Sequence, residues 1–377
     1  MEITRNEVLK SRMLRILSVN ARISMQDIAN KLGVTKVNVY GLFNELLEEY
    51  DIGFVPEISI DKLWKWEFIK KARLRTKRGI ISEAMEELPL TGFGEYLILI
   101  KFIGKKPEND EITKAMGNSY VPQFIARISG EYDLMIYAVA RSYEDAIGFT
   151  DALNKSLFKY NMLAYTNRIW GCFGFFPLSN KLIEQFDIFD TYKNLLFGLN
   201  GKGRETFTEI GKKFNQGPAQ MLYAYDRLAR TEILKRVTYF EAKPKATLSI
   251  AIMLKIENAK AFEESKNKWL MRVVKEYESK ENEYVFMCDM ANPKGMFIIM
   301  NFHGKERYEK FFSCIRSCLK GVEVSKMQIS KTLLGNLGLR DFDMRYSSQY
   351  KCLERNKLVP SLKERLNEPV TENPNEI

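Results

Sequence analysis

The chain has 377 residues, of which 45% are hydrophobic and 12% aromatic. It is too long for one ordinary core and too rich in apolar side chains to be a disordered chain. A formal charge of +10 and a pI near 9.1 predict an anionic partner, either nucleic acid or a membrane surface. No apolar run approaches the roughly 20 residues that span a bilayer, and residues 1–10 lack an apolar signal core. We therefore expect a cytoplasmic protein without a membrane span.

The cysteine pattern argues against a metal site. Five cysteines are scattered along the chain without a CxxC pair. Cys314 and Cys318 share one face of a predicted helix, but no second pair accompanies them, and His303, in an apolar strand pattern, is the single histidine. We expect free thiols in a reducing compartment, no metal and no cofactor.

In chain order, the first expected element is an amphipathic helix over residues 8–17, which ends at Asn20. Ser24 is a predicted N-cap for a short second helix, and Gly33 is expected to supply the turn that follows it. A third helix is predicted from Thr35 to about residue 49, which completes a helix-turn-helix. Residues 52–60 alternate and predict a wing hairpin.

The third helix offers an outward polar face, because Val39, Leu42 and Leu46 turn toward the core. Its outward residues are Lys36, Asn38, Tyr40 and Asn44. Such a helix can enter a DNA major groove, where Asn pairs with adenine edges and Lys with guanine or phosphate.

This head is repeated later in the chain. Residues 28–46 align without a gap on residues 210–228, with apolar or aromatic side chains at matched positions such as Phe43 and Tyr225. Thr206 or Thr208 is the expected cap of the second helix in this copy, and Pro218 suits the first turn of the third. The outward residues of that third helix are Gln220, Tyr223, Arg227 and Arg230. We expect both outward sets to contact double-stranded DNA.

Each head is followed by segments with a βαββαβ pattern. In the first copy, strands are predicted over 95–103, 121–128, 133–140 and 162–175, with a polar helical stretch after the first strand and a helix over 143–159. In the second, strands are predicted over 247–256, 284–290, 295–302 and 322–333, with helices over 259–281 and 305–319. The predicted fold class is therefore α+β, with two winged helix-turn-helix domains, each followed by a ferredoxin-like βαββαβ domain.

These elements divide the chain into six parts. They are a winged helix-turn-helix (1–61), a basic connector (62–94), a ferredoxin-like domain (95–178), a second winged helix-turn-helix (190–245), a second ferredoxin-like domain (246–337) and a partly disordered tail (338–377).

The two heads differ in charge. Residues 1–61 carry seven Lys and Arg against nine Asp and Glu, whereas residues 190–245 carry eleven against six. The connector over 62–79 adds eight basic residues against one acidic residue. Phosphate contacts supply much of DNA affinity. We therefore expect the connector and the second head to make most of the contacts with phosphate.

Two stretches resemble a known family. ILSVNARISMQDIANKLGVTKVNVYGLFNELLEEYDI is similar to the helix-turn-helix of the Lrp/AsnC (leucine-responsive, feast/famine) regulators, and ISGEYDLMIYAVARSYEDAIGFTDAL to the centre of their ligand-binding α/β domain. The resemblance covers residues 8–175 well and 192–334 only by pattern. A basic residue is usual in the family where this chain has Leu42, and ANPKGMFIIM replaces the glycine-tyrosine-aspartate turn in the second copy.

The resemblance implies a sequence-specific DNA-binding transcriptional regulator that is not an enzyme, with a small-molecule effector such as an amino acid bound between α/β domains. The implied effector turn is Gly130, Glu131, Tyr132 and Asp133. It also implies pairing through the sheets, either as an intrachain pseudo-dimer of diverged halves or as a homo-oligomer.

Two other functions stay open. The double arrangement also resembles the siroheme decarboxylases, which use histidine and arginine on tetrapyrrole carboxylates. Here only His303 is present, with Arg127, Arg141 and Arg168 as candidate carboxylate partners. A protein-interaction module without DNA contact is the third alternative.

Overall fold

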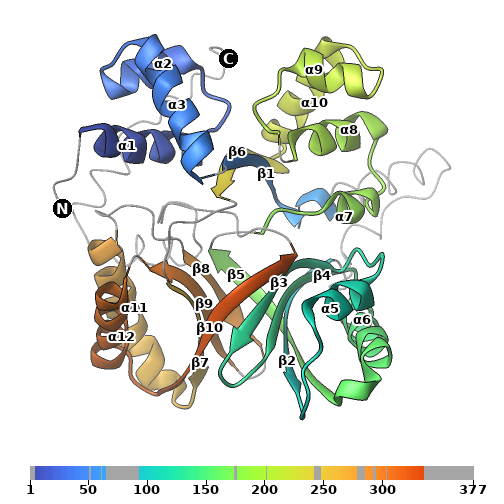
Figure 1. Cartoon of the computed structure of the whole chain (residues 1–377), viewed down its shortest axis with the longest axis vertical. Coiled ribbons are helices and arrows are strands. Elements are labelled where there is room, and N and C mark those ends of the chain that lie inside the picture. Colours follow the sequence, from blue (N-terminus) through green and yellow to red (C-terminus); the bar gives the residue numbers. More distant parts are fainter. Residues whose placement is uncertain are drawn as a thin grey trace, which may run out of the picture.

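The computed structural model describes residues 5–50, 52–60, 62–64, 93–173, 176–200, 202–241, 248–277, 285–291, 294–302 and 304–334. Most of the predicted connector, the predicted tail and His303 lie outside these ranges. The chain is a mixed α/β protein with a large antiparallel sheet. Two helical clusters, the first head and the second head, lie on one side of that sheet (Figure 1). Among the described helices, none has the length and apolarity needed to cross a bilayer.

The first head contains α1 (Arg5–Val19), α2 (Met25–Leu32), α3 (Lys36–Tyr50) and β1 (Ile52–Ile58). Ser24 caps α2, because its hydroxyl accepts a hydrogen bond from the backbone nitrogen of Asp27 at 3.0 Å. Gly33 ends α2 with φ at 67°, in the left-handed region that favours glycine. The Thr35 hydroxyl likewise accepts from the Asn38 nitrogen at 3.3 Å at the start of α3. All three residues lie where the sequence predicted them.

The second head contains α8 (Asp190–Leu199), α9 (Phe207–Lys213), α10 (Pro218–Arg230) and β6 (Leu234–Glu241). Thr206 and Glu209 form a capping box at the start of α9. The Thr206 hydroxyl accepts from the Glu209 nitrogen at 3.2 Å, and the Glu209 carboxylate accepts from the Thr206 nitrogen at 2.7 Å. Pro218 occupies the first turn of α10. A short helix, α7 (Asn180–Glu184), leads into this head.

The wing hairpin predicted over residues 52–60 is wrong. β1 is a single strand, and it pairs antiparallel with β6 of the second head from Ile52 to Ile58. An alternating pattern shows that a strand has one buried face, but it does not identify the strand that takes up its backbone hydrogen bonds. The two heads therefore share one two-stranded sheet.

The α/β part consists of two halves with the predicted order of strands and helices. The first half contains β2 (Gly94–Phe102), α5 (Asn109–Met116), β3 (Pro122–Ser129), β4 (Leu134–Ala140), α6 (Tyr143–Ser156) and β5 (Met162–Phe173), with a short 3-10 helix (Phe158–Tyr160) between α6 and β5. The second half contains β7 (Leu248–Ile256), α11 (Ala259–Tyr277), β8 (Val285–Met290), β9 (Gly295–Phe302), α12 (Lys305–Cys318) and β10 (Val322–Leu334).

The eight strands of the two halves close into one barrel. The strand order is β3-β4-β2-β5 in the first half and β8-β9-β7-β10 in the second. β10 pairs antiparallel with β3, and β5 pairs antiparallel with β8 (Figure 1). The two halves thus pair within a single chain, and closure leaves this sheet without a free edge.

Alternating side chains divide the core into layers. Ile98 and Ile100 on β2 belong to the cluster under α5 and α6, whereas the neighbouring Leu97 and Leu99 face the inside of the barrel. The inner cluster continues through Phe176 to the buried residues of both heads. One apolar core therefore joins the closed sheet to the heads.

Candidate nucleic-acid interface and ligand groove

The outward face of α3 carries the four residues predicted to contact DNA. Val39, Leu42 and Leu46 are buried and fix the rotation of the helix. The remaining face is exposed, and Tyr40 keeps 48% of its surface accessible. The exposed predicted residues are Lys36, Asn38, Tyr40 and Asn44.

The outward face of α10 is exposed in the same way. Met221, Ala224 and Leu228 are buried against the head. All four predicted contact residues are exposed: Gln220, Tyr223, Arg227 and Arg230. The Gln220 side-chain oxygen accepts a hydrogen bond from the Gly217 nitrogen at 3.0 Å, so this residue also caps the helix.

Charge is unevenly distributed over the two heads. On the first head, the Lys10 ammonium lies 2.7 Å from the carboxylates of both Glu45 and Glu49, so it neutralises acidic side chains on α3. On the second head, α10 carries the exposed Arg227 and Arg230. Its neighbour α9 ends in exposed lysines. The second head is therefore the more favourable partner for phosphate.

Two arginines join the heads in a reciprocal contact, which we call the arginine clasp (Arg22 and Arg204). Arg22 donates to the carbonyl oxygens of Gly203 at 2.6 Å and Glu205 at 3.0 Å. Arg204 donates back to the carbonyl oxygen of Ala21 and, at 3.1 Å, to that of Ile23. Each guanidinium thus satisfies backbone carbonyls of the opposite head.

Aromatic rings cover both guanidinium groups. Arg22 lies 4.4 Å from the ring centre of Phe207, and Arg204 lies 5.2 Å from that of Phe43. Burial lowers the pKa of both arginines from its ordinary value. Arg22 and Arg204 occupy matched positions of the sequence repeat. The alignment of residues 28–46 with 210–228 can be extended backwards to the turns before α2 and α9, where it matches Arg22 with Arg204. The match alone does not show that the two side chains join the heads.

The predicted effector turn lies where the two halves meet. Gly130 has φ at 139°, and a Cβ there would lie 2.6 Å from the backbone oxygen of Lys326 on β10. Glu131 lies 3.3 Å from the Lys255 ammonium of β7. Burial raises the pKa of Glu131, but hydrogen bonds from Ser325 and the Lys255 charge outweigh it and hold that pKa below its ordinary value. The turn therefore forms part of the contact between the halves.

Tyr132 and Asp133 are buried within this turn. Burial, together with the adjacent Glu131, raises the pKa of Tyr132 to about 12. The Asp133 carboxylate accepts a hydrogen bond from the Phe102 nitrogen at 2.9 Å. It also forms an ion pair with the Lys106 ammonium at 2.6 Å. These two contacts of Asp133 hold the turn against the end of β2.

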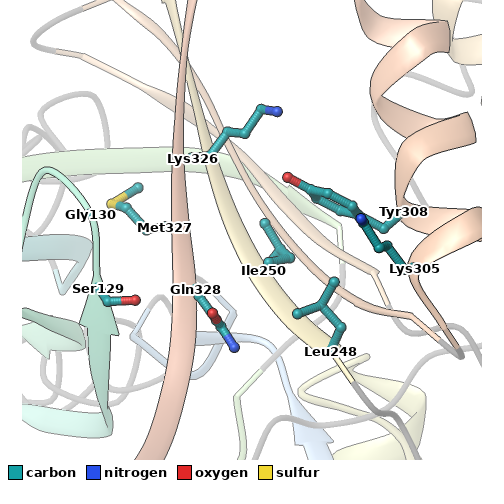
Figure 2. A pocket seen from close by; sticks show the side chains of 9 residues that line it. All are labelled: Ser129, Gly130, Leu248, Ile250, Lys305, Tyr308, Lys326, Met327 and Gln328. Atoms are coloured by element: carbon teal, nitrogen blue, oxygen red, sulfur yellow. The ribbon is translucent and has the colours of Figure 1, made fainter.

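A groove of about 640 Å³ lies beside Gly130, between α12 and the β3–β10–β7 strands (Figure 2). Lys305 and Tyr308 of α12 lie on one side of it, and Lys326 on β10 faces them. Its other lining residues are Ser129, Gly130, Leu248, Ile250, Met327 and Gln328. The lining contains two cations and no carboxylate, which suits an anionic small molecule. Of the predicted effector residues, only Gly130 lines it.

Replacing Gly130 with alanine is expected to lower the free energy of unfolding by roughly 2 kcal/mol or more, because a Cβ there meets backbone and the backbone angle is strained. Gly104→Ala is the matched control, since Gly104 also has a positive φ, of 98°, but its Cβ would meet open space. Urea denaturation of both variants measures the difference. Equal stability of the two would contradict the close packing of the Gly130 turn on β10.

Two of the three arginines considered as carboxylate partners are held by other residues of the chain. Arg127 donates to the Asn109 side chain at 2.9 Å, and Arg141 donates to the Gln185 carbonyl at 3.1 Å. Arg168 is exposed on β5. The Cys314 and Cys318 sulfurs lie 4.0 Å apart on α12. Within the described ranges, no group of three or more His, Cys, Asp or Glu side chains is arranged to hold a metal ion.

No protein-family model and no curated protein matches this chain. Among solved structures, the siroheme decarboxylase NirDL matches with a TM-score of 0.51 and 11% identity, covering 93% of this chain and 99% of that one. The same enzyme with an iron-uroporphyrin III analogue matches with a TM-score of 0.52 and 10% identity, at the same coverage. An AsnC family transcriptional regulator from Agrobacterium tumefaciens matches 44% of this chain and 89% of its own, with a TM-score of 0.27 and 13% identity.

The prediction that this chain is not an enzyme is contradicted by the comparison, because two solved structures that cover 93% of this chain, at 11% and 10% identity, are of a siroheme decarboxylase. The prediction followed from the resemblance to the regulators, and one fold can support both binding and catalysis. At this level of identity, the likeness shows that the chain shares its fold with the siroheme decarboxylase over nearly its whole length.

Proposed function

We propose that the chain is a cytoplasmic, sequence-specific regulator that binds double-stranded DNA through the outward faces of α3 and α10. The single observation that carries the proposal is the exposure of all eight predicted contact residues on two helices whose heads are joined. We interpret each head as a helix-turn-helix whose third helix enters the major groove, with β1 and β6 replacing separate wings. The six-part domain division given above belongs to this proposal, with the shared β1–β6 pair in place of the two predicted wings.

The chemistry of the exposed residues supports this function. Asn38 and Gln220 have side-chain amides that can pair with an adenine edge. Arg227 and Arg230 can make charge-assisted hydrogen bonds to phosphate, and Arg is the commonest partner of guanine. The proposal concerns the heads, and a catalytic activity of the α/β part is compatible with it.

Fluorescence anisotropy of the full chain with labelled genomic duplexes tests the proposal. If the heads bind DNA, the logarithm of affinity falls linearly with the logarithm of salt concentration, with a slope of about 0.9 per neutralised phosphate. Affinity independent of salt, or none at about 50 mM salt, would refute it.

A second candidate function concerns the α/β part. The full-length likeness to a siroheme decarboxylase favours an enzyme acting on a carboxylate-bearing tetrapyrrole. The groove offers Lys305 and Lys326 as partners for carboxylates. Lys326 lies 3.5 Å from the ring centre of Phe312, which restrains its ammonium group on the groove side of α12. The same cations would suit the carboxylate of an amino-acid effector.

Titrations of the protein with iron-uroporphyrin III and with a mixture of amino acids distinguish the two candidate ligand classes. We expect Lys326→Gln to weaken binding of the correct ligand about tenfold, since it removes one charge-assisted contact of roughly 1.4 kcal/mol. An absorption shift with the porphyrin supports the enzyme, and a calorimetric signal with an amino acid supports the effector. Lys260→Gln, an exposed change on α11, is the control. Equal binding by both variants would exclude the groove as the site.

A further inference from the structure

We infer that one copy of the chain binds one non-palindromic duplex site, with the second head providing most phosphate contacts and the first head reading bases. This inference rests on the proposed DNA binding and specifies the class of DNA site. In a twofold dimer, both subunits present the same residues, so the preferred operator is a palindrome. The relevant question is whether this chain presents two equal or two different surfaces.

The pairing of the heads is completed within the chain. β1 takes β6 as its partner, and the arginine clasp ties the turn before α2 to the turn before α9. The Ala21 nitrogen also donates to the Val237 carbonyl at 2.7 Å. Gly203 lies so close to β6 that a Cβ would come 2.4 Å from Val237 Cγ1. A second chain is therefore not needed to join two heads that each carry a recognition helix.

The two halves of the α/β part are also paired within one chain. Both seams of the barrel, β10–β3 and β5–β8, join strands of one chain. Within the described barrel, every strand has two neighbours, so dimer formation through its edges is unavailable. Over its described strands the barrel thus offers no edge strand to a second chain, which supports action on DNA as a single chain.

The two recognition surfaces have opposite charges at matched positions. The gapless repeat places Arg227 opposite Glu45 and Arg230 opposite Glu48. All four side chains are exposed. Lys10 neutralises part of the acidic side, but no basic side chain on α3 replaces the two arginines. Phosphates that attract the second head at these positions would be repelled by the first.

The remaining matched positions also differ in chemistry. Lys36 matches Pro218, Tyr40 matches Leu222, and Asn44 matches Asp226. Only Asn38 and Gln220 keep the same functional group, a side-chain amide. The two helices would therefore read different base sequences, and each half-site would have its own consensus.

Selection from a pool of random duplexes with the full chain, followed by native mass spectrometry of the selected complex, tests this inference. We expect an asymmetric consensus and one chain per duplex. Hydroxyl-radical footprinting of Arg227→Glu should lose protection at one end of the site, while Asn38→Ala should change base preference at the other.

A charge reversal on the first head gives a second test. Glu48→Arg gives the first head the charge found at Arg230 and leaves the ion pairs of Lys10 with Glu45 and Glu49 in place. We therefore expect roughly threefold to tenfold tighter binding at low salt and a salt slope steeper by about 0.9. Glu264→Arg makes the same change on an exposed face of α11 and is the control.

A palindromic consensus, two chains per duplex, or binding without sequence preference would overturn the inference while leaving DNA binding intact. Absence of any salt-dependent binding would overturn the proposed function as well. Equal gains from Glu48→Arg and Glu264→Arg would show that the face of α3 does not approach DNA.

Discussion

Replacing both Arg227 and Arg230 with alanine is expected to lower the affinity of the chain for duplex DNA by roughly tenfold to a hundredfold at about 0.1 M salt. Both side chains lie exposed on the outward face of α10, where a groove-bound helix would bring them to phosphate. Each neutralised phosphate contributes about 0.9 to the salt slope, so the double variant should lose about 1.8. Anisotropy titrations at several salt concentrations measure both quantities.

The control removes the same charge elsewhere. Lys260 and Lys268 are exposed on α11, in the α/β part, and their double alanine variant should keep the salt slope of the unchanged protein. Circular dichroism should show that both variants fold, because exposed helix positions tolerate alanine. If both double variants lost affinity equally, net charge rather than the α10 face would govern binding.

Replacing Arg22 and Arg204 together with alanine is expected to lower the free energy of unfolding by about 2–4 kcal/mol. The arginine clasp satisfies backbone carbonyls of Ala21, Ile23, Gly203 and Glu205 at the contact between the heads. Removing the guanidinium groups leaves these oxygens without donors and uncovers the Phe43 and Phe207 rings. Urea denaturation measures the loss, and the apparent melting temperature should fall by several degrees.

Two further variants separate charge and geometry from general destabilisation. Lysine at both positions keeps the charge but not the planar fork that reaches two carbonyls, so it should recover less than half of the loss. Arg12→Ala, an exposed change on α1, should stay within about 0.5 kcal/mol of the unchanged protein. A clasp variant as stable as Arg12→Ala would show that the β1–β6 pairing alone holds the heads together.

Local signals in the sequence were sufficient for most of the secondary structure. Ser24, Gly33 and Pro218 are cap and first-turn residues whose preferences depend on neighbouring backbone alone, and each occupies its predicted place. The strand at Gly295–Phe302 was predicted to the residue because a continuous apolar run is bounded by chain breakers. The exposed face of α3 followed from the period of Val39, Leu42 and Leu46.

The position of the candidate ligand groove could not be predicted from the sequence. Gly130 could be singled out from a family resemblance, but Lys305, Tyr308 and Lys326 come from a different half of the chain. Side chains that meet across a β10–β3 seam have no fixed spacing in the sequence, so no motif connects them.

The helices and strands of the two βαββαβ halves, the first helix-turn-helix and the charge difference between the heads could be predicted from the sequence, because they depend on short-range periodicity and composition. Only long-range packing explains why β1 pairs with β6 instead of forming a wing and why β10 and β3 close the barrel. It also explains why Arg22 and Arg204 each donate to backbone carbonyls of the opposite head. Backbone hydrogen bonds are alike for every residue, and the free energy that chooses among partner strands comes from burying side chains far apart in the chain.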